Sequence, residues 1–164
     1  MYTNNFHELY TRYAGDIYRF ALFLCGDAAD AEDITAETFA RALTGKAPLL
    51  SATVKGYLLT IARNQHLASL QRSKRRAALP PDLADSAPQA DHVTGHKTEL
   101  EALRKYLQTF PEVDRAALLF RADGMPYAEI ATALDISLAS AKVKVHRMRL
   151  KLAEWRTKRE QIDI

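Results

Sequence analysis

The sequence is short of cysteine and of long apolar runs. Its 164 residues include one cysteine, Cys25, which excludes an internal disulfide framework and any site that needs several thiolates. The N-terminal segment has neither the basic stretch nor the apolar stretch of a secretory signal, and nowhere do about 18 apolar residues follow one another without a charge. We therefore expect a cytoplasmic protein that does not insert into a membrane.

The sequence also lacks the patterns of catalytic and metal-binding sites. It has no glycine-rich phosphate-binding loop and no convincing Ser/His/Asp arrangement. His92 and His96 lie four residues apart beside Asp91, which is the spacing of two metal ligands on one helix face. They fall in a stretch of Ala, Pro and Asp without a second ligand pair. We therefore expect no metal site, no cofactor and no enzymatic activity.

The net charge is small, but the charges are well separated along the chain. The net charge is +3, from 23 Lys and Arg against 20 Asp and Glu. Residues 27–37 carry five acids and no cation, residues 55–76 carry six cations and no acid, and residues 142–159 carry eight cations and one acid. One charged run is usually a solvated helix face, but two separate basic runs indicate a polyanion contacted by both halves.

Residues 77–95 have the composition of an extended linker. They hold three of the six prolines among Ala, Asp and Ser, and carry three acids and no cation. This segment divides the chain into an N-terminal half, residues 1–76, and a C-terminal half, residues 96–164.

Both halves show apolar residues at steps of three and four, which is typical of amphipathic helices. Prolines and small polar residues stand at several helix starts. The first predicted helix ends near residue 25, and the others span residues 27–43, 54–76, 96–109, 111–122, 127–134 and 138–158. The helix over 54–76 has apolar residues on two faces, so we expect it to pack on two sides. The predicted fold is all-α, with two small helical bundles joined by a flexible linker.

Residues 127–152 have the layout of a helix-turn-helix. A short helix is followed by a tight turn, Asp135-Ile136-Ser137, and Ser137 is a natural cap for the next helix. On that helix an apolar stripe begins at Ala141 and repeats at steps of four and three, with cations on the other faces. Such a helix suits the major groove of DNA, and a plain helical hairpin is the alternative.

Three segments, in this order, resemble bacterial sigma factors of the extracytoplasmic-function (ECF) class, the minimal members of the sigma-70 family. They are DAEDITAETFARA, then GYLLTIARNQHLASLQRSKRR, then FPEVDRAALLFRADGMPYAEIATALDIS followed by KVKVHRMRLKL. The resemblance implies a promoter-specificity subunit with sigma region 2 in residues 1–76 and region 4 in residues 96–164. Such a subunit has no active site and uses the catalysis of core RNA polymerase.

The acidic segment resembles the family's helix that contacts the clamp helices of the polymerase. An acidic helix is electrostatically suited to a basic coiled coil. The resemblance implies that the polymerase is contacted by Asp30, Asp33, Ile34, Glu37 and Phe39.

The first basic segment resembles the family's helix that melts and reads the −10 element. Asn64 falls where the family holds a flipped-out base, and an amide can both donate and accept hydrogen bonds in such a pocket. The resemblance implies −10 contacts by Lys55, Tyr57, Arg63, Asn64, Arg72, Lys74, Arg75 and Arg76. For Tyr57, which stands where the family usually has Trp, burial in the core is the alternative.

The second basic segment resembles the family's helix that reads the −35 element. The resemblance implies contacts by Ser137, Ser140, Lys142, Val143, Lys144, His146 and Arg147. Asp135 stands where the family commonly has a turn glycine, which is tolerable because Asp adopts left-handed backbone conformations more readily than most residues.

The resemblance further implies three partners. They are core RNA polymerase, through its clamp helices and flap, promoter DNA, and an anti-sigma factor that in the family is often tethered to the membrane. The alternative is a stand-alone helix-turn-helix transcription regulator that does not bind core polymerase. The acidic segment and the IARN-containing helix, which occur in the sigma order, favour the sigma interpretation.

Overall fold

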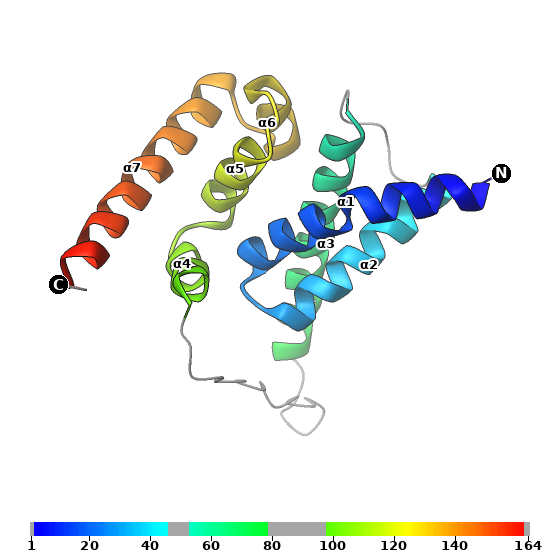
Figure 1. Cartoon of the computed structure of the whole chain (residues 1–164), viewed down its shortest axis with the longest axis horizontal. Helices are drawn as coiled ribbons and strands as arrows, with labels where there is room; N and C mark the ends of the chain where they lie inside the picture. The colour runs from blue at the N-terminus through cyan, green and yellow to red at the C-terminus, as the bar shows by residue number, and fades with distance from the viewer. Residues whose placement is uncertain (1, 46–52, 79–97, 163–164) are drawn as a thin grey trace.

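The computed structural model describes residues 2–45, 53–78 and 98–162 (Figure 1). These residues form seven helices and their connections, with no strand among them, so the predicted all-α fold is confirmed. Most of the predicted linker, including Asp91 and His92, lies outside the described residues, and so does the neighbouring His96.

Three helices make up the N-terminal half: α1 (Tyr2–Cys25), α2 (Ala28–Thr44) and α3 (Val54–Ala77). Each packs against the other two. The contacts follow the apolar periodicity of the sequence, as Ile17 and Phe20 on α1 show, which are 0% and 2% exposed. The result is a three-helix bundle held together by these apolar stripes.

The boundaries of these helices follow local chemistry. α1 ends at Gly26, which adopts φ of 80°, a left-handed conformation that costs glycine little. The side chain of Asp27 then caps α2 by accepting from the Ala29 N–H at 3.4 Å. The Thr53 hydroxyl caps α3 by accepting from the Gly56 N–H at 3.0 Å. Both predicted helix starts are confirmed.

Four helices make up the C-terminal half: α4 (Glu99–Leu107), α5 (Glu112–Ala122), α6 (Tyr127–Leu134) and α7 (Leu138–Ile162). α5, α6 and α7 pack against one another. α4 is shorter than the predicted 96–109, because the hydroxyl of Thr98 caps it by accepting from the Glu101 N–H at 3.3 Å. α7 extends beyond the predicted residue 158.

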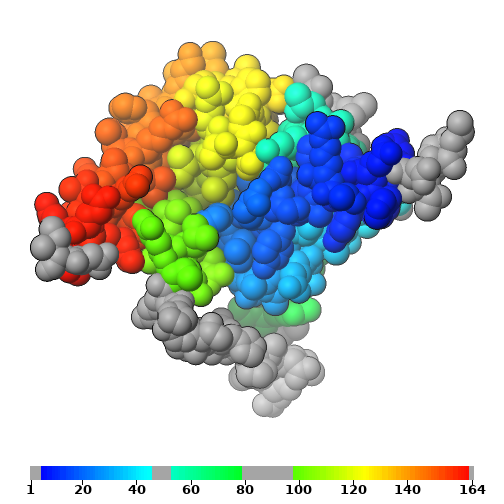
Figure 2. Space-filling view, in the orientation of Figure 1, coloured from blue at the N-terminus to red at the C-terminus, as the bar shows by residue number. Residues whose placement is uncertain are grey.

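The two bundles also pack against each other. α5 lies beside α1 and α3, and α4 lies beside α1. The rings of Phe20 and Phe120 stack across this junction with centroids 5.2 Å apart, within one apolar core that draws residues from both halves. In Figure 2, α4 and α5 directly abut α1. The predicted two-sided packing of α3 is confirmed, and its second side faces the C-terminal half.

None of the helices in the described ranges combines the length and the apolar character needed to cross a bilayer.

Candidate nucleic-acid and protein interfaces

The helix-turn-helix consists of α6, α7 and the turn between them. Asp135 adopts φ of 53° and ψ of 50°, as its place in the turn predicted. This left-handed residue reverses the chain so that the Ile136 N–H donates to the Ala131 carbonyl at 3.0 Å. The Ser137 hydroxyl accepts from the Ser140 N–H at 3.0 Å, so the predicted cap of α7 is confirmed.

The faces of α7 differ in the way that a groove-binding helix requires. Ala141, Val145 and Met148 are buried against the rest of the C-terminal half. The opposite side of the first turns is open to solvent, and Val143 is 44% exposed there. Most of the residues predicted to contact the −35 element are exposed, namely Ser137, Lys142, Val143, His146 and Arg147. Ser140 is half-buried.

Lys144 differs from the other cations of α7. Its Nζ lies 2.9 Å from Oδ1 of Asp114 on α5, and the two side chains are 31% and 25% exposed. This ion pair joins α7 to α5, so it orients the helix as well as compensating one of its charges.

The C-terminal end of α3 carries a group of exposed cations. Arginine and lysine at this end also interact favourably with the helix dipole. Asn64, two to three turns earlier, is exposed, whereas Tyr57 is half-buried. The exposed predicted −10 cations are Arg72, Lys74, Arg75 and Arg76.

Arg63 does not lie on this exposed surface. It is 8% exposed, and its Nε and Nη2 donate to Oε1 and Oε2 of Glu112 at 2.9 and 2.8 Å. Its Nη1 donates to the Ala133 carbonyl at 3.4 Å. In this arrangement Arg63 is buried, links the two halves through hydrogen bonds and is not accessible to DNA.

Lys55 is engaged in a similar way at the start of α3. Its Nζ lies 3.3 Å from Oδ1 of Asp123, in the C-terminal half, and 3.4 Å from Oδ2 of Asp16 on α1. Burial opposes the charged form of Lys55, but the two carboxylates outweigh it and raise the pKa of Lys55. Burial also disfavours the charged form of Asp123, which raises its pKa, although the nearby ammonium group of Lys55 acts to lower it.

His66 lies one turn beyond Arg63 and is 4% exposed. Its Nε2 has no hydrogen-bond partner among the described residues. Burial lowers the pKa of His66, Arg115 and Arg63 lower it further, and Glu112 opposes them. The imidazole is therefore held neutral at the junction of the two halves.

The predicted polymerase-contacting residues divide into two groups on α2. Asp30, Asp33 and Glu37 follow one another at steps of three and four and are exposed. Ile34 and Phe39 are 4% and 2% exposed in the core. These two side chains hold α2 in place, and Phe39 also lines a groove between α1 and α2.

The exposed acids of α2 make few interactions with other side chains of the chain. Glu37 accepts from Nε of Arg41 at 3.0 Å, and both side chains are about half exposed. Such a surface pair contributes little to stability. Partial burial raises the pKa of Asp30, and the neighbouring carboxylates of Asp27 and Asp33 raise it further.

An open apolar groove of about 710 Å³ runs between α1 and α2 beside this acidic face. Tyr10 and Leu43, which are 45% and 52% exposed, lie along it, and the ring of Tyr10 packs edge-on against Phe39 with centroids 5.0 Å apart. The groove was not predicted from the sequence, although aromatic residues four apart on α1, Phe6 and Tyr10, are a signal for it.

Two carboxylates of the C-terminal half, Glu112 and Asp123, were also not predicted as site residues. They pair with cations 49 and 68 positions away in the sequence, and no local spacing signals such contacts. Within the described ranges, no group of three or more His, Cys, Asp or Glu side chains is placed to hold a metal ion.

Models of two protein families match the chain. The model described as "Sigma-70 region 2" matches residues 9–76, and the model described as "Sigma-70, region 4" matches residues 100–152. The matches thus cover α3 with its cations as well as the helix-turn-helix. A match in both halves favours the sigma interpretation over a stand-alone regulator.

Two relatives span both halves. The ECF RNA polymerase sigma factor SigE of Mycolicibacterium smegmatis is 34% identical over 158 residues, which cover 92% of this chain and 61% of the relative. The ECF RNA polymerase sigma factor SigM of Bacillus subtilis is 32% identical over 148 residues, which cover 88% of this chain and 91% of the relative. The chain thus spans less than two thirds of the first relative and nearly all of the second.

A solved structure has the same fold. It is that of the sigma factor RpoE of Bartonella quintana in complex with the anti-sigma factor NepR, with a TM-score of 0.71 over 92% of this chain and 95% of that chain, at 21% identity. Because family models match both halves and the match to SigM covers most of both chains, the chain belongs to the ECF class of the sigma-70 family of bacterial RNA polymerase sigma factors.

Proposed function

We propose that this chain binds core RNA polymerase and directs transcription initiation from promoters that carry −35 and −10 elements. The observation that carries the proposal is the presence of two exposed surfaces of opposite charge on separate elements. One is the acidic face of α2, and the other is the cationic face of α7 at the helix-turn-helix. A protein partner and a nucleic acid can therefore be held at the same time.

The acidic face of α2 serves as the polymerase-binding surface. Asp30, Asp33 and Glu37 are exposed along one side of the helix, where a basic coiled coil such as the clamp helices would find complementary charge. The open groove between α1 and α2 adds apolar contact area next to these acids. Charge speeds the encounter, and the groove adds the burial that slows dissociation.

The first turns of α7 serve as the −35-reading surface. In a major groove, Val143 and His146 would face base edges, because they lie on the helix side opposite the buried stripe. Arg147 lies beside them and is also placed for a base edge, whereas Lys142 is placed for phosphates. The C-terminal half, residues 96–164, supplies this module and contacts the polymerase flap.

The N-terminal half, residues 1–76, serves as the −10 module. Asn64 is exposed on α3 and has both a donor and an acceptor for a flipped-out base. The exposed cations at the end of α3 track the phosphates of the melted strand. Residues 77–95 link the modules.

Control by an anti-sigma factor completes the proposal. The Bartonella structure of the same fold contains an anti-sigma factor, which makes a regulator of that kind a reasonable partner for this chain. The protein acts in the cytoplasm, and any membrane tether belongs to the regulator.

In vitro transcription with purified core polymerase and a library of genomic fragments tests this function. The chain should co-purify with the core enzyme and yield transcripts whose upstream sequences share two spaced elements. A chain that binds DNA but neither co-purifies with core polymerase nor yields transcripts would be a stand-alone regulator, and the proposal would be overturned.

A further inference from the structure

Lys142 and Lys144 lie on either side of Val143, the exposed apolar residue on the side of α7 that faces away from the core. One residue step turns an α-helix by about 100°, so the two lysines flank that side symmetrically. Their surroundings differ, because Lys142 is exposed and Lys144 is partly buried. Two lysines that are equivalent in the sequence pattern thus become different in the fold.

The ammonium group of Lys144 is held by a carboxylate of another helix. Its Nζ lies 2.9 Å from Oδ1 of Asp114. Asp114 lies in the first turn of α5, where the helix dipole also favours a negative charge. The two side chains are 31% and 25% exposed, so water screens their attraction less than it screens a fully exposed pair.

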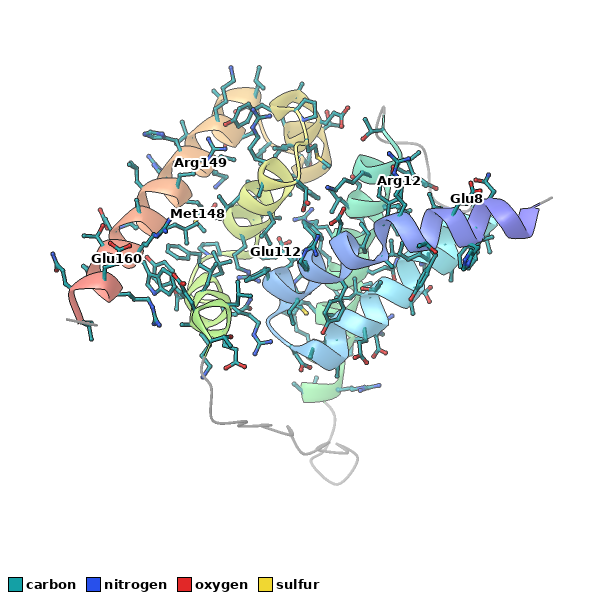
Figure 3. The ribbon with its side chains drawn as sticks, viewed as in Figure 1. Glu8, Arg12, Glu112, Met148, Arg149 and Glu160 are labelled. Atoms are coloured by element: carbon teal, nitrogen blue, oxygen red, sulfur yellow. The ribbon has the colours of Figure 1, made fainter. Side chains whose placement is uncertain are left out.

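The first turn of α5 directs its two acids to different neighbours. Glu112, which Figure 3 labels where α5 meets the N-terminal helices, accepts from Arg63 on α3. Asp114 instead accepts from Lys144 on α7. The pair between Asp114 and Lys144 therefore forms entirely within the C-terminal half and does not depend on how the two halves pack.

This pair adds direction to the packing of α7 on α5. Ala141 and Val145, which precede and follow Lys144 on the buried stripe, are 0% exposed, but burial of apolar surface is not directional. A charge-assisted hydrogen bond prefers one geometry and so limits rotation of α7 about its axis. The carboxylate of Asp114 would also repel a phosphate brought close to Lys144.

We propose that Lys144 and Asp114 are positioning residues that fix the rotation of α7 in the major groove, and that Lys142 supplies the phosphate contact on the other flank. This inference rests on the proposed function, because it assigns roles within the −35-reading surface. Lys144 keeps Val143 and His146 directed at base edges without contacting the DNA. The pair therefore contributes to promoter discrimination and not to the nonspecific attraction of α7 for DNA.

The salt dependence of duplex binding by the full chain separates the two lysines. The probe is a fluorescein-labelled duplex of random sequence, followed by fluorescence anisotropy. Each phosphate contact on duplex DNA contributes about 0.9 to the slope of log K against log salt. Lys142→Gln should lower the slope by about 0.9, which means about 3.5-fold less loss of affinity across a fourfold change in salt. Lys144→Gln should leave the slope unchanged.

The two glutamine variants are matched controls for each other. Each removes one positive charge from α7, and the two positions are two residues apart. A change in overall charge alone would therefore affect both slopes equally. An equal fall of the slope in Lys142→Gln and Lys144→Gln would show that Lys144 also contacts a phosphate and would overturn the proposal.

Promoter discrimination tests the positioning role. Holoenzyme assembled with core polymerase is measured on a promoter fragment recovered from the genomic library and on a random duplex. Lys144→Gln and Asp114→Asn should each lower the ratio of the two affinities about tenfold, which corresponds to one misplaced base contact. The double variant should lower the ratio no further, because both changes break the same pair. Lys144→Arg, which keeps a cation for the carboxylate, should retain the ratio.

Thermal denaturation followed by circular dichroism distinguishes positioning from a general loss of stability. A lower thermal midpoint with an unchanged discrimination ratio in Lys144→Gln and Asp114→Asn would make the pair purely structural and would overturn the proposal. If Lys144→Gln fails to fold, Asp114→Asn, which keeps the lysine, provides the measurement. A ratio that stays unchanged in that variant would equally overturn the proposal.

Run-off transcription with the unsubstituted chain separates this inference from the proposed function. Transcripts together with an equal fall of the slope in both glutamine variants would leave the sigma function standing and remove the positioning role. Absence of transcripts and of core binding would remove the sigma function, while the slopes on random duplex would still report which lysine contacts phosphates.

Discussion

The guanidinium of Arg63 and the carboxylate of Glu112 form a bidentate ion pair between α3 and α5, with side chains that are 10% and 16% exposed. Burying two charges in this way costs a large desolvation free energy, and their mutual attraction offsets it only while both partners are present. It therefore makes the packing of the two halves sensitive to the loss of a single charge.

Removing one partner should be worse than removing both. Glu112→Ala leaves Arg63 buried without its carboxylate and should lower the free energy of unfolding by about 3 kcal/mol. Arg63→Met combined with Glu112→Leu removes both charges at similar volume and should cost less than the single change. Urea denaturation followed by circular dichroism measures both values. Equal losses in the two variants would show that the pair is not an energetically coupled unit.

Charge reversal on the acidic face of α2 should separate polymerase binding from folding. Glu37→Lys places a cation where the basic clamp helices are expected, and a cost of about 2 kcal/mol corresponds to roughly 30-fold weaker core binding. The Glu37–Arg41 ion pair that this change removes is half exposed, so the thermal midpoint should change little. Competition against a labelled sigma factor for core polymerase measures the affinity.

The reciprocal variant is Arg147→Ala on the exposed face of α7. Because Arg147 is placed for a base edge, its loss should weaken promoter binding by about 1–3 kcal/mol and leave core binding unchanged. Core binding that falls equally in both variants would contradict the assignment of the two surfaces to different partners.

Asp135 tests the turn of the helix-turn-helix. At φ of 53° a glycine fits without strain, whereas a β-branched side chain is strongly disfavoured. Asp135→Gly should alter the free energy of unfolding by less than about 0.5 kcal/mol, and Asp135→Val should lower it by about 1–2 kcal/mol. Thermal denaturation compares the two. A valine variant as stable as the glycine variant would show that the left-handed turn is not required in solution.

The lowered pKa of the buried His66 predicts a loss of stability in mild acid. Its folded-state pKa lies below its unfolded value, near 6.5, so the unfolded chain binds the proton more readily. Stability should be constant above about pH 7 and should fall as the pH drops below about 6.5, until the folded-state pKa is reached. Glu112, Arg115 and Arg63 are the charged groups that face His66.

The measurement is the thermal midpoint at several values between about pH 7.5 and about pH 5.5, which bracket the unfolded pKa of histidine. In His66→Gln, which cannot take up a proton, the midpoint should fall less over this range than in the unsubstituted chain. An identical fall in both proteins would assign the acid sensitivity to other groups.

Local features of the fold were predictable because their causes are close in sequence. The caps at Asp27, Thr53 and Ser137 accept from N–H groups within three residues, and the left-handed turn at Asp135 depends on its own backbone. The apolar stripes that define the helices repeat every three to four residues. Contiguous segments of the chain also carry the resemblance to the family, because each motif lies within a single helix or a pair of neighbouring helices.

The sequence by itself determined the helices, the helix-turn-helix and the separation of acidic from basic surfaces. Only the tertiary structure decided which of those charges are free. Ile34 and Phe39 turn inward because α1 and α3 cover that side of α2, and Arg63 and Lys55 are paired because α5 brings Glu112 and Asp123 to them. Pairings across 49 and 68 residues follow from how the two halves pack, and no local periodicity encodes them.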